Sequence, residues 1–289
     1  MALTSAPNVI APVGATLGEG PVWIDGALWF VDIKAPCVYC LQGNGKLERW
    51  PAPAPVGWVL PATGGGLLAG LKSGIHHFDP ASGGFSALIA VELGMPDNRL
   101  NDAVAGPDGA LWFGSMDDRE AAPSGRFYRY AGGQLFDTGL PGAVVTNGPA
   151  ISPDGRTLYV TDTFAGTIGE AAINDDGSLG PLRPFVAIDR ADGYPDGPTV
   201  DAQGHVWTGL FGGWSARRYD PAGVLVETIR FPVANVTKIA FGGPALTTAY
   251  ATTAKLALDA DALAAQPLAG HLFAFDAGVA GVPVNNVQL

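Results

Sequence analysis

Short apolar stretches alternate with turn-forming residues along the whole chain, and this pattern repeats. The phrase Asp-Gly-Ala-Leu-Trp-Phe occurs at 25–30 and returns unchanged at 108–113, with variants at 154–159 and 203–207. In each copy a tight turn precedes a short apolar run, which is typical of a β-hairpin that enters a partly buried strand. No amphipathic stretch with helical periodicity exceeds two turns. The pattern therefore predicts an all-β fold.

The glycines of these phrases measure the length of the repeat. The spacing from Gly26 to Gly109 is nearly twice the spacing from Gly109 to Gly155 and from Gly155 to Gly204. A divergent unit is therefore expected at 64–70, and a last unit near 244–250. Six units of about 48 residues have the size of propeller blades. We expect one domain over residues 1–289, a six-bladed β-propeller, closed by a strand near 8–12 beside one near 271–275. The best candidate for a short helix is 256–266.

One position recurs seven or eight residues before the turn glycine of the phrase. The innermost strand of every propeller blade lines the central channel, so side chains at one offset converge on one ring. A ring of charged and amide groups there implies ion pairing or a bound metal, because buried charge needs a partner. A water-filled polar channel is the alternative. The six channel positions are Glu19, Gly57, Asn101, Asn147, Asp196 and Lys238.

Oxygen atoms dominate this ring, which contains neither His nor Cys. Carboxylate and amide oxygens suit Ca²⁺, Mg²⁺ or Mn²⁺, and they are compatible with Fe²⁺ (Fe(II)) and Zn²⁺. About three protein ligands would leave coordination positions open for water and substrate, as catalysis requires. The sequence therefore predicts one divalent metal ion on the axis.

Composition excludes several classes of function. The chain has 289 residues, 47% of them hydrophobic, and a net charge of -11 with scattered basic residues, which argues against a nucleic-acid groove. No apolar run is long enough to span a membrane. Residues 1–14 lack a basic segment and a long apolar segment, so we expect no signal peptide and a cytoplasmic location. Cys37 and Cys40 lack a second ligand pair for zinc and are expected to be structural thiols. No feature indicates an obligate protein partner.

Five segments in register resemble the gluconolactonase/regucalcin-like (senescence marker protein) family. They are Leu-Gly-Glu-Gly-Pro-Val-Trp at 17–23, Asn-Arg-Leu-Asn-Asp at 98–102, Thr-Asn-Gly at 146–148, Tyr-Pro-Asp-Gly at 194–197 and Phe-Gly-Gly-Pro at 241–244. The segments 71–76 and 235–238 are especially similar to the pentonolactonase branch, such as xylonolactonases. Over essentially the full length, the resemblance implies a six-bladed propeller, an axial divalent metal and hydrolysis of aldonolactones.

The resemblance also implies roles for individual residues. Glu19, Asn147 and Asp196 match the metal ligands of the family, and Asp196 also matches its general base. Arg99 and Asn101 match residues that contact the substrate, and Asn101 would reach the metal through a water molecule. The resemblance therefore predicts that these five side chains meet in one site.

Asp102 and Lys238 are further candidates with open roles. Asp102 would either orient Arg99 or Asn101, or cap a turn. Lys238 would neutralise the carboxylates, hold the ring oxygen of a lactone, or point outward. Both residues lie in or beside the channel positions, so only their contacts can distinguish these roles.

The loops 51–62 and 117–124 are expected to determine which sugar is accepted. Some family members have a substrate-contacting Glu where this chain has Arg119, between Asp118 and Glu120, so that contact is not assigned. Trp214 follows two glycines; it would stack on a sugar at the pocket mouth, or pack in the core, which is the favoured interpretation.

These features together predict a metal-dependent hydrolase that opens a pentono- or hexonolactone to the aldonic acid. The metal would polarise the carbonyl, water would attack, and Asp196 would accept the proton. One competing function is a propeller hydrolase for aryl or organophosphate esters, which would have a more apolar and less Arg-dependent pocket. The other is a non-enzymatic propeller that binds Ca²⁺ or a sugar acid. The retained base Asp196 and the open coordination positions favour the enzyme.

Overall fold

The computed structural model describes residues 6–289. Strands account for nearly all of its regular structure, together with the short helix α1 (Ala260–Ala265) and the 3₁₀ helix η1 (Arg190–Asp192). The all-β prediction is therefore confirmed, and α1 lies inside the stretch 256–266 where a short helix was expected. Of the N-terminal segment considered for a signal peptide, residues 1–5 lie outside the described residues.

Four of the sheets contain four strands each, which follow one another in chain order and pair antiparallel. The first sheet consists of β2 (Gly18–Ile24), β3 (Ala27–Asp32), β4 (Cys37–Gln42) and β5 (Leu47–Pro51), and the second of β6 (Val56–Pro61), β7 (Leu67–Leu71), β8 (Gly74–Asp79) and β9 (Gly84–Ala90). The third consists of β10 (Asn98–Ala105), β11 (Leu111–Asp117), β12 (Phe127–Ala131) and β13 (Gln134–Asp137), and the fourth of β14 (Thr146–Ile151), β15 (Thr157–Asp162), β16 (Thr167–Ala172) and β17 (Arg183–Ala187).

A fifth sheet has eight strands in two runs of four. One run is β18 (Tyr194–Val200), β19 (Val206–Phe211), β20 (Ser215–Tyr219) and β21 (Leu225–Arg230); the other is β22 (Val236–Gly242), β23 (Thr248–Thr253), β24 (Leu272–Asp276) and β1 (Asn8–Ala11). A single parallel bridge between Gly197 and Lys238 joins the two runs. Strand β1 pairs antiparallel with β24, with Asn8 opposite Ala274. The predicted pairing of a strand from each end of the chain is thus confirmed.

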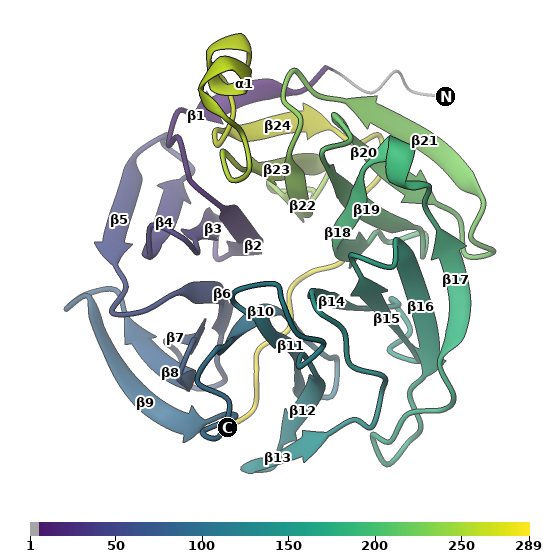
Figure 1. Cartoon of the computed structure of the whole chain (residues 1–289). Helices are drawn as coiled ribbons and strands as arrows, with labels where there is room; N and C mark the ends of the chain where they lie inside the picture. Colours follow the sequence, from purple (N-terminus) through teal and green to yellow (C-terminus); the bar gives the residue numbers. More distant parts are fainter. Residues whose placement is uncertain (1–5) are drawn as a thin grey trace.

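The first strand of every run lies nearest the centre of the molecule. Strands β2, β6, β10, β14, β18 and β22 pack against one another in this order, and β22 packs against β2. Figure 1 shows them around a central axis, with strands such as β5, β9 and β13 at the periphery. Hydrophobic clusters fill the space between consecutive runs. Five of the six aromatic residues of the repeated phrase are buried there, as expected for core packing: Phe30, Trp112, Phe113, Tyr159 and Trp207. The sixth, Trp29, is partly buried.

Every inner strand carries a register shift where the sequence placed the channel position. Such a bulge releases residues from the hydrogen-bonded ladder and changes the direction of their side chains. All six channel positions lie at or within these shifts, so the offset read from the sequence corresponds to a real structural position. The shifts lie between Glu19 and Val22, Val56 and Trp58, Leu100 and Ala103, Asn147 and Ala150, Pro195 and Pro198, and Val236 and Ile239.

The two faces of the ring are built differently. Glu19, near the start of the inner strand β2, pairs with Val31, near the end of β3. The loop that follows the second strand of a run therefore lies on the face where the inner strand begins. We call this face the entry face. The first turn of each run lies on the opposite face. There the backbone N–H of Gln288 donates to the carbonyl of Gly109 at 2.9 Å. Figure 1 shows the C-terminal segment, 277–289, crossing the centre of the ring, and it therefore covers the face opposite the entry face.

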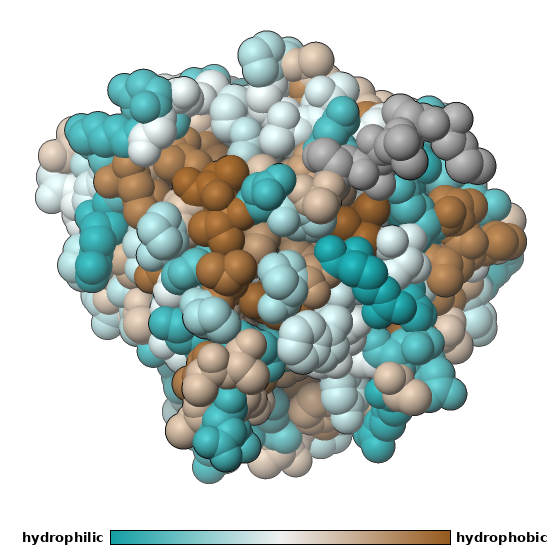
Figure 2. Space-filling view, turned by 90° about the horizontal axis from the view of Figure 1, so that it is seen from above, coloured by the Kyte–Doolittle hydropathy of each residue, from teal (hydrophilic) through white to brown (hydrophobic). Residues whose placement is uncertain are grey.

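The outer surface of the molecule agrees with the mixture of charged and hydrophobic residues in the sequence. Seen edge-on in Figure 2, hydrophilic residues are interspersed with smaller groups of apolar ones. Among the described residues, no helix has the length and hydrophobicity needed to cross a membrane.

Cys37 and Cys40 are buried free thiols, and burial raises the pKa of Cys40 to about 12. A thiol with so high a pKa is a weak nucleophile at neutral pH, which supports a structural role.

Candidate active site

The three predicted metal ligands lie near the entry-face end of their inner strands. Glu19 belongs to β2, Asn147 to β14 and Asp196 to β18, and their exposed fractions are 5%, 3% and 6%. These strands are otherwise mostly apolar, and the register shifts explain how polar side chains are accommodated in them. The fold therefore buries all three side chains at the same level of the central channel.

Electrostatics link the two carboxylates. Burial raises the pKa of Glu19 to about 7, and repulsion from Asp102 contributes to this shift. Burial also raises the pKa of Asp196 well above its usual range, with repulsion from Glu19 as the next cause. Lys238 lowers both pKa values but does not offset these effects. Burial and mutual repulsion thus disfavour the ionised forms of both carboxyl groups, and a cation bound beside them would stabilise those forms.

A network of amide side chains connects the ligand candidates with Arg99. Nη1 of Arg99 donates to Oδ1 of Asn101 at 2.5 Å. Nδ2 of Asn101 donates to Oδ1 of Asn147 at 3.0 Å and to the carbonyl oxygen of Thr146 at 2.6 Å. Nδ2 of Asn147 donates to Oγ1 of Thr163 at 2.9 Å. The structure therefore brings together Arg99, Asn101 and Asn147, as the sequence predicted, and restrains both amides.

A buried ion pair narrows the roles that were left open for Asp102 and Lys238. Nζ of Lys238 donates to Oδ1 of Asp102 across the channel, and the backbone N–H of Gly148 donates to Oδ2 of Asp102 at 3.0 Å. Oδ1 of Asp102 also accepts from the backbone N–H of Ala103 at 2.9 Å. Asp102 therefore orients neither Arg99 nor Asn101, because its oxygens are engaged by Lys238 and by two backbone N–H groups. Lys238 is 7% exposed and does not point outward.

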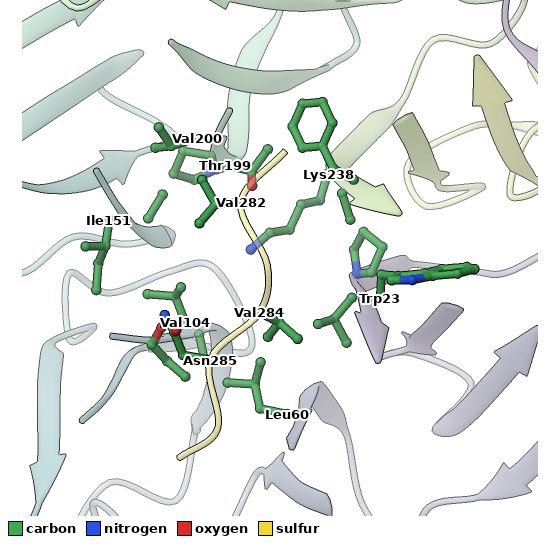
Figure 3. Close-up of a pocket in the computed structure, with 18 of the residues that line it drawn as sticks. Trp23, Leu60, Val104, Ile151, Thr199, Val200, Lys238, Val282, Val284 and Asn285 are labelled. Atoms are coloured by element: carbon green, nitrogen blue, oxygen red, sulfur yellow. Dashed lines mark hydrogen bonds between the residues drawn. The ribbon is translucent and has the colours of Figure 1, made fainter. Parts of the chain in front are cut away.

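A cavity of about 200 Å³ lies beyond this ion pair, towards the covered face. It is lined by the residues that follow the channel positions in the inner strands and by the C-terminal segment, including Val282, Val284 and Asn285. Figure 3 shows Lys238 reaching into this cavity while the C-terminal segment crosses it. None of the three ligand candidates lines it. The ion pair therefore separates the cavity from the carboxylates.

The loop after β11 contains a residue that sequence reasoning missed. Arg119, at the position of the family's substrate-contacting Glu, is 66% exposed at its side chain and pairs with Asp97 at 2.6 Å. Its neighbour Asp118 instead accepts a hydrogen bond from Nε of Arg99 at 2.9 Å. The acidic side chain of this loop that contacts Arg99 is therefore Asp118. The only sequence signal for it was its place between Asp117 and Arg119, directly after the third apolar run.

Two aromatic side chains stand at the entry face, in loops that follow second strands. Trp214 is 42% exposed and Phe164 is 37% exposed. The core-packing interpretation of Trp214 is therefore wrong. Its backbone has φ 55 and is held by hydrogen bonds with the carbonyl of Ala234 at 3.0 Å and the N–H of Phe231 at 2.9 Å. These bonds hold the backbone of Trp214 in the left-handed region, and the residue remains partly exposed to solvent.

The conformation of Trp214 makes a testable prediction about stability. The left-handed region costs an L-residue about 1–2 kcal/mol, whereas glycine adopts it freely. Trp214→Gly should therefore melt at or above the temperature of the wild type, and Trp214→Ala, which keeps the unfavourable φ and loses the indole, should melt below the glycine variant. Thermal unfolding followed by circular dichroism checks this. A more stable alanine variant would show that the backbone is not strained.

The side chains present define what kind of cation site the channel offers. Within residues 6–289, no three His, Cys, Asp or Glu side chains are grouped as a metal site. The candidate set of Glu19, Asp196 and Asn147 contains two carboxylates and one amide. Such a set provides oxygen donors only, with the amide oxygen of Asn147 as the neutral member.

Comparison with known proteins identifies the family. The family model described as "SMP-30/Gluconolactonase/LRE-like region" matches residues 17–255. An L-arabinolactonase from Azospirillum brasilense is 34% identical over 282 residues, which cover 95% of this chain and 93% of that protein. A 6-deoxy-6-sulfogluconolactonase from Pseudomonas putida is 30% identical, covering 92% and 93%. A solved structure of regucalcin from Agrobacterium tumefaciens, described as a calcium-binding protein, has a TM-score of 0.93 and 27% identity, covering 99% of this chain and 98% of that one. The chain therefore belongs to the SMP-30/gluconolactonase/LRE-like family.

Proposed function

We propose that this protein hydrolyses a sugar lactone, a pentono- or hexonolactone, to the aldonic acid. The names of the relatives support lactone hydrolysis as the reaction class. The observation that carries the proposal is the pair of buried carboxylates, Glu19 and Asp196, whose pKa values are both raised. Carboxyl groups with perturbed pKa values in a buried polar site are typical of catalytic centres. Arg99 and Asn101 stand beside them as hydrogen-bonding groups for a polar substrate.

The proposed fold is a single six-bladed propeller over residues 1–289. Four sheets would be four blades, and the eight-stranded sheet would be two more, divided at the one bridge between Gly197 and Lys238. The closed order of the inner strands supports this count. Such an arrangement positions residues from β2, β10, β14 and β18 around one axis without any long loop.

The residues present fit one divalent cation at the entry-face end of the channel. Glu19, Asp196 and Asn147 would hold it, because their oxygens are buried and the two carboxylates repel each other without it. A cation bound there would polarise a lactone carbonyl and stabilise developing negative charge. Regucalcin, the structural neighbour, is described as calcium-binding. The cation would be one of Ca²⁺, Mg²⁺, Mn²⁺, Fe²⁺ or Zn²⁺.

The protein's own groups would divide the remaining work. Asp196 would accept the proton of the attacking water, since a carboxylate whose pKa is raised by burial is a stronger base than an exposed one. Arg99 would donate hydrogen bonds to the lactone from its planar guanidinium group. The exposed rings of Trp214 and Phe164 would offer apolar surface at the entry face for the C–H face of a sugar. Lys238 would limit the repulsion among the carboxylates.

The stability of the cation-free protein is expected to fall as the pH rises from 5 to 8. The pKa of Glu19 is raised from 4.5 to about 7 by burial and by Asp102, so between these values the folded chain holds a proton that the unfolded chain has released. The free energy of unfolding then decreases with increasing pH. A divalent cation competes with this proton, so it should raise the melting temperature more at pH 8 than at pH 5.

Melting curves with and without Ca²⁺ or Mn²⁺ at the two pH values test this prediction. In Glu19→Gln the dependence of the cation effect on pH should be much weaker, because one of the two titrating carboxylates is gone. An equal cation effect at both pH values in the wild type would contradict the assignment of these carboxylates as ligands.

Proton release from a panel of fresh lactones tests the proposed function. The panel contains xylono-, arabinono-, glucono- and galactonolactone, with uncatalysed hydrolysis subtracted, and an aryl ester and paraoxon as competing substrates. Turnover that is lost with a chelator and restored by one of the five metals would support the proposal. Faster turnover of the esters would favour the aryl or organophosphate esterase. Cation binding without turnover of any substrate would favour a binding protein.

A further inference from the structure

Three basic side chains converge on one carboxylate at the entry face. Oδ1 of Asp118 lies 2.9 Å from Nε of Arg99 and 2.8 Å from Nζ of Lys34, and Oδ2 lies 3.8 Å from Nζ of Lys72. Lys34 follows β3, Lys72 follows β7 and Asp118 follows β11, so the contacts connect the loops of three consecutive sheets. The backbone carbonyl of Asp118 also accepts from Lys34, at 3.2 Å. Asp118 is therefore held in place from two sides.

The guanidinium group of Arg99 is restrained on two of its three nitrogens. Nε is bound to Asp118, and Nη1 donates to Oδ1 of Asn101 and to the carbonyl of Leu100 at 3.2 Å. Nη2 has no hydrogen-bond partner among the described residues. The side chain is only 3% exposed, and burial lowers the pKa of Arg99 while Asp118 opposes this shift. One nitrogen is thus left to bind a substrate, and its direction depends on Asp118.

We propose that Asp118 is a positioning residue for the reaction. It holds the planar guanidinium of Arg99 so that Nη2 faces the lactone, and Lys34 and Lys72 hold Asp118 in turn. The inference rests on the proposed lactone hydrolysis for its effect on kinetics, but the contact between Asp118 and Arg99 can be tested without turnover. The planar guanidinium group donates its hydrogen bonds in a fixed geometry, and it loses selectivity for its acceptor when the group can rotate.

Kinetics of Asp118→Ala, Asp118→Glu and a control provide the first test. Loss of a hydrogen bond to a charged group weakens binding by a factor of about 10 to 100. The kcat/KM of Asp118→Ala should therefore fall by about this factor, mainly through a higher KM. Asp118→Glu keeps the charge and should recover part of the loss. Asp97→Ala removes the neighbouring, exposed partner of Arg119 (51% and 66% exposed side chains) and should leave both constants unchanged.

The split between the constants distinguishes positioning from a structural role. If Asp118 only stabilised its loop, a preparation of the Asp118→Ala variant would contain a smaller fraction of active protein. The apparent kcat would then fall while KM stayed unchanged. That result, or no recovery in Asp118→Glu at an unchanged melting temperature, would overturn the proposal. Lys34→Met should cause a smaller increase in KM in the same direction, since it acts one contact further away.

Solvent exchange of the Nε proton of Arg99 provides a second test that is independent of activity. In ¹⁵N-arginine-labelled protein, this proton should exchange slowly because it is buried and bound to Asp118, and Arg99→Lys identifies its signal. In Asp118→Ala the exchange should become at least about 10-fold faster, in line with the loss of a charged hydrogen bond. Unchanged exchange would overturn the proposal even if the wild type turned over no lactone, whereas absent turnover with faster exchange would count against the proposed function alone.

Discussion

Asp196→Asn is expected to lower kcat for lactone hydrolysis by about 100- to 10,000-fold, the usual contribution of a positioned general base. The substitution keeps the shape of the side chain and an oxygen atom but removes the proton acceptor. Because burial and Glu19 together raise the pKa of Asp196 well above its usual range, the cation-free variant should be at least as stable as the wild type. Initial rates of proton release, together with melting curves, measure both effects.

Two control variants separate catalysis from metal binding. Glu19→Gln should also reduce the rate, but excess cation should restore part of its activity if Glu19 acts only as a ligand. Asp175→Asn changes an exposed acid in the loop between β16 and β17 and should leave the rate unchanged. Activity of Asp196→Asn close to that of the wild type at saturating cation would rule out Asp196 as the base, and a collapse of its melting temperature would make the loss structural.

Lys238→Met is expected to destabilise the protein by about 3–5 kcal/mol, the usual cost of removing one partner of a buried ion pair. Lys238 is 8% and Asp102 3% exposed at the side chain. Without the ammonium group, Asp102 would be left as an uncompensated charge beside Glu19 and Asp196, whose pKa values it already raises. Urea unfolding in the absence of divalent cation measures the change in the free energy of unfolding.

A double-mutant cycle shows whether this loss belongs to the pair. Asp102→Asn combined with Lys238→Met should be more stable than Lys238→Met alone, because the unpaired charge has been removed. Lys46→Met is the matched control: the side chain of Lys46 is 65% exposed and that of its partner Glu48 is 32% exposed, and such a solvent-accessible pair contributes less than about 1 kcal/mol. Equal destabilisation by Lys238→Met and Lys46→Met would show that the buried pair has no special importance for the fold.

Several features of the site could be predicted because their signals are local and periodic. The repeated turn and apolar phrase predicted the strands, and the common offset selected positions that lie at the register shifts of the inner strands. The contact between Asn101 and Asn147 followed from this offset, although 46 residues separate them. Equivalent positions of a repeat must meet when the repeats surround one axis, so local periodicity contained this long-range information.

The remaining contacts of the site do not follow from periodicity. Lys238 and Asp102 are 136 residues apart, and Lys34 and Asp118 are 84 residues apart. In both pairs a long lysine side chain reaches its partner, across the channel for Lys238 and between loops for Lys34. The partner that each lysine finds depends on its own rotamer and on the paths of the surrounding loops. The exposure of Trp214 is of the same kind, because its backbone is held by hydrogen bonds from outside its own hairpin.

The sequence by itself thus determined the all-β repeat, the closure between the chain ends and the level of the channel at which Glu19, Asn147 and Asp196 lie. Regular spacing is sufficient for these features, because each strand repeats the same local geometry. Only the tertiary structure decided that Lys238 pairs with Asp102 and that Asp118 holds Arg99. These choices depend on which charged group is nearest after burial, and a buried charge takes the partner that the surrounding strands and loops bring within reach.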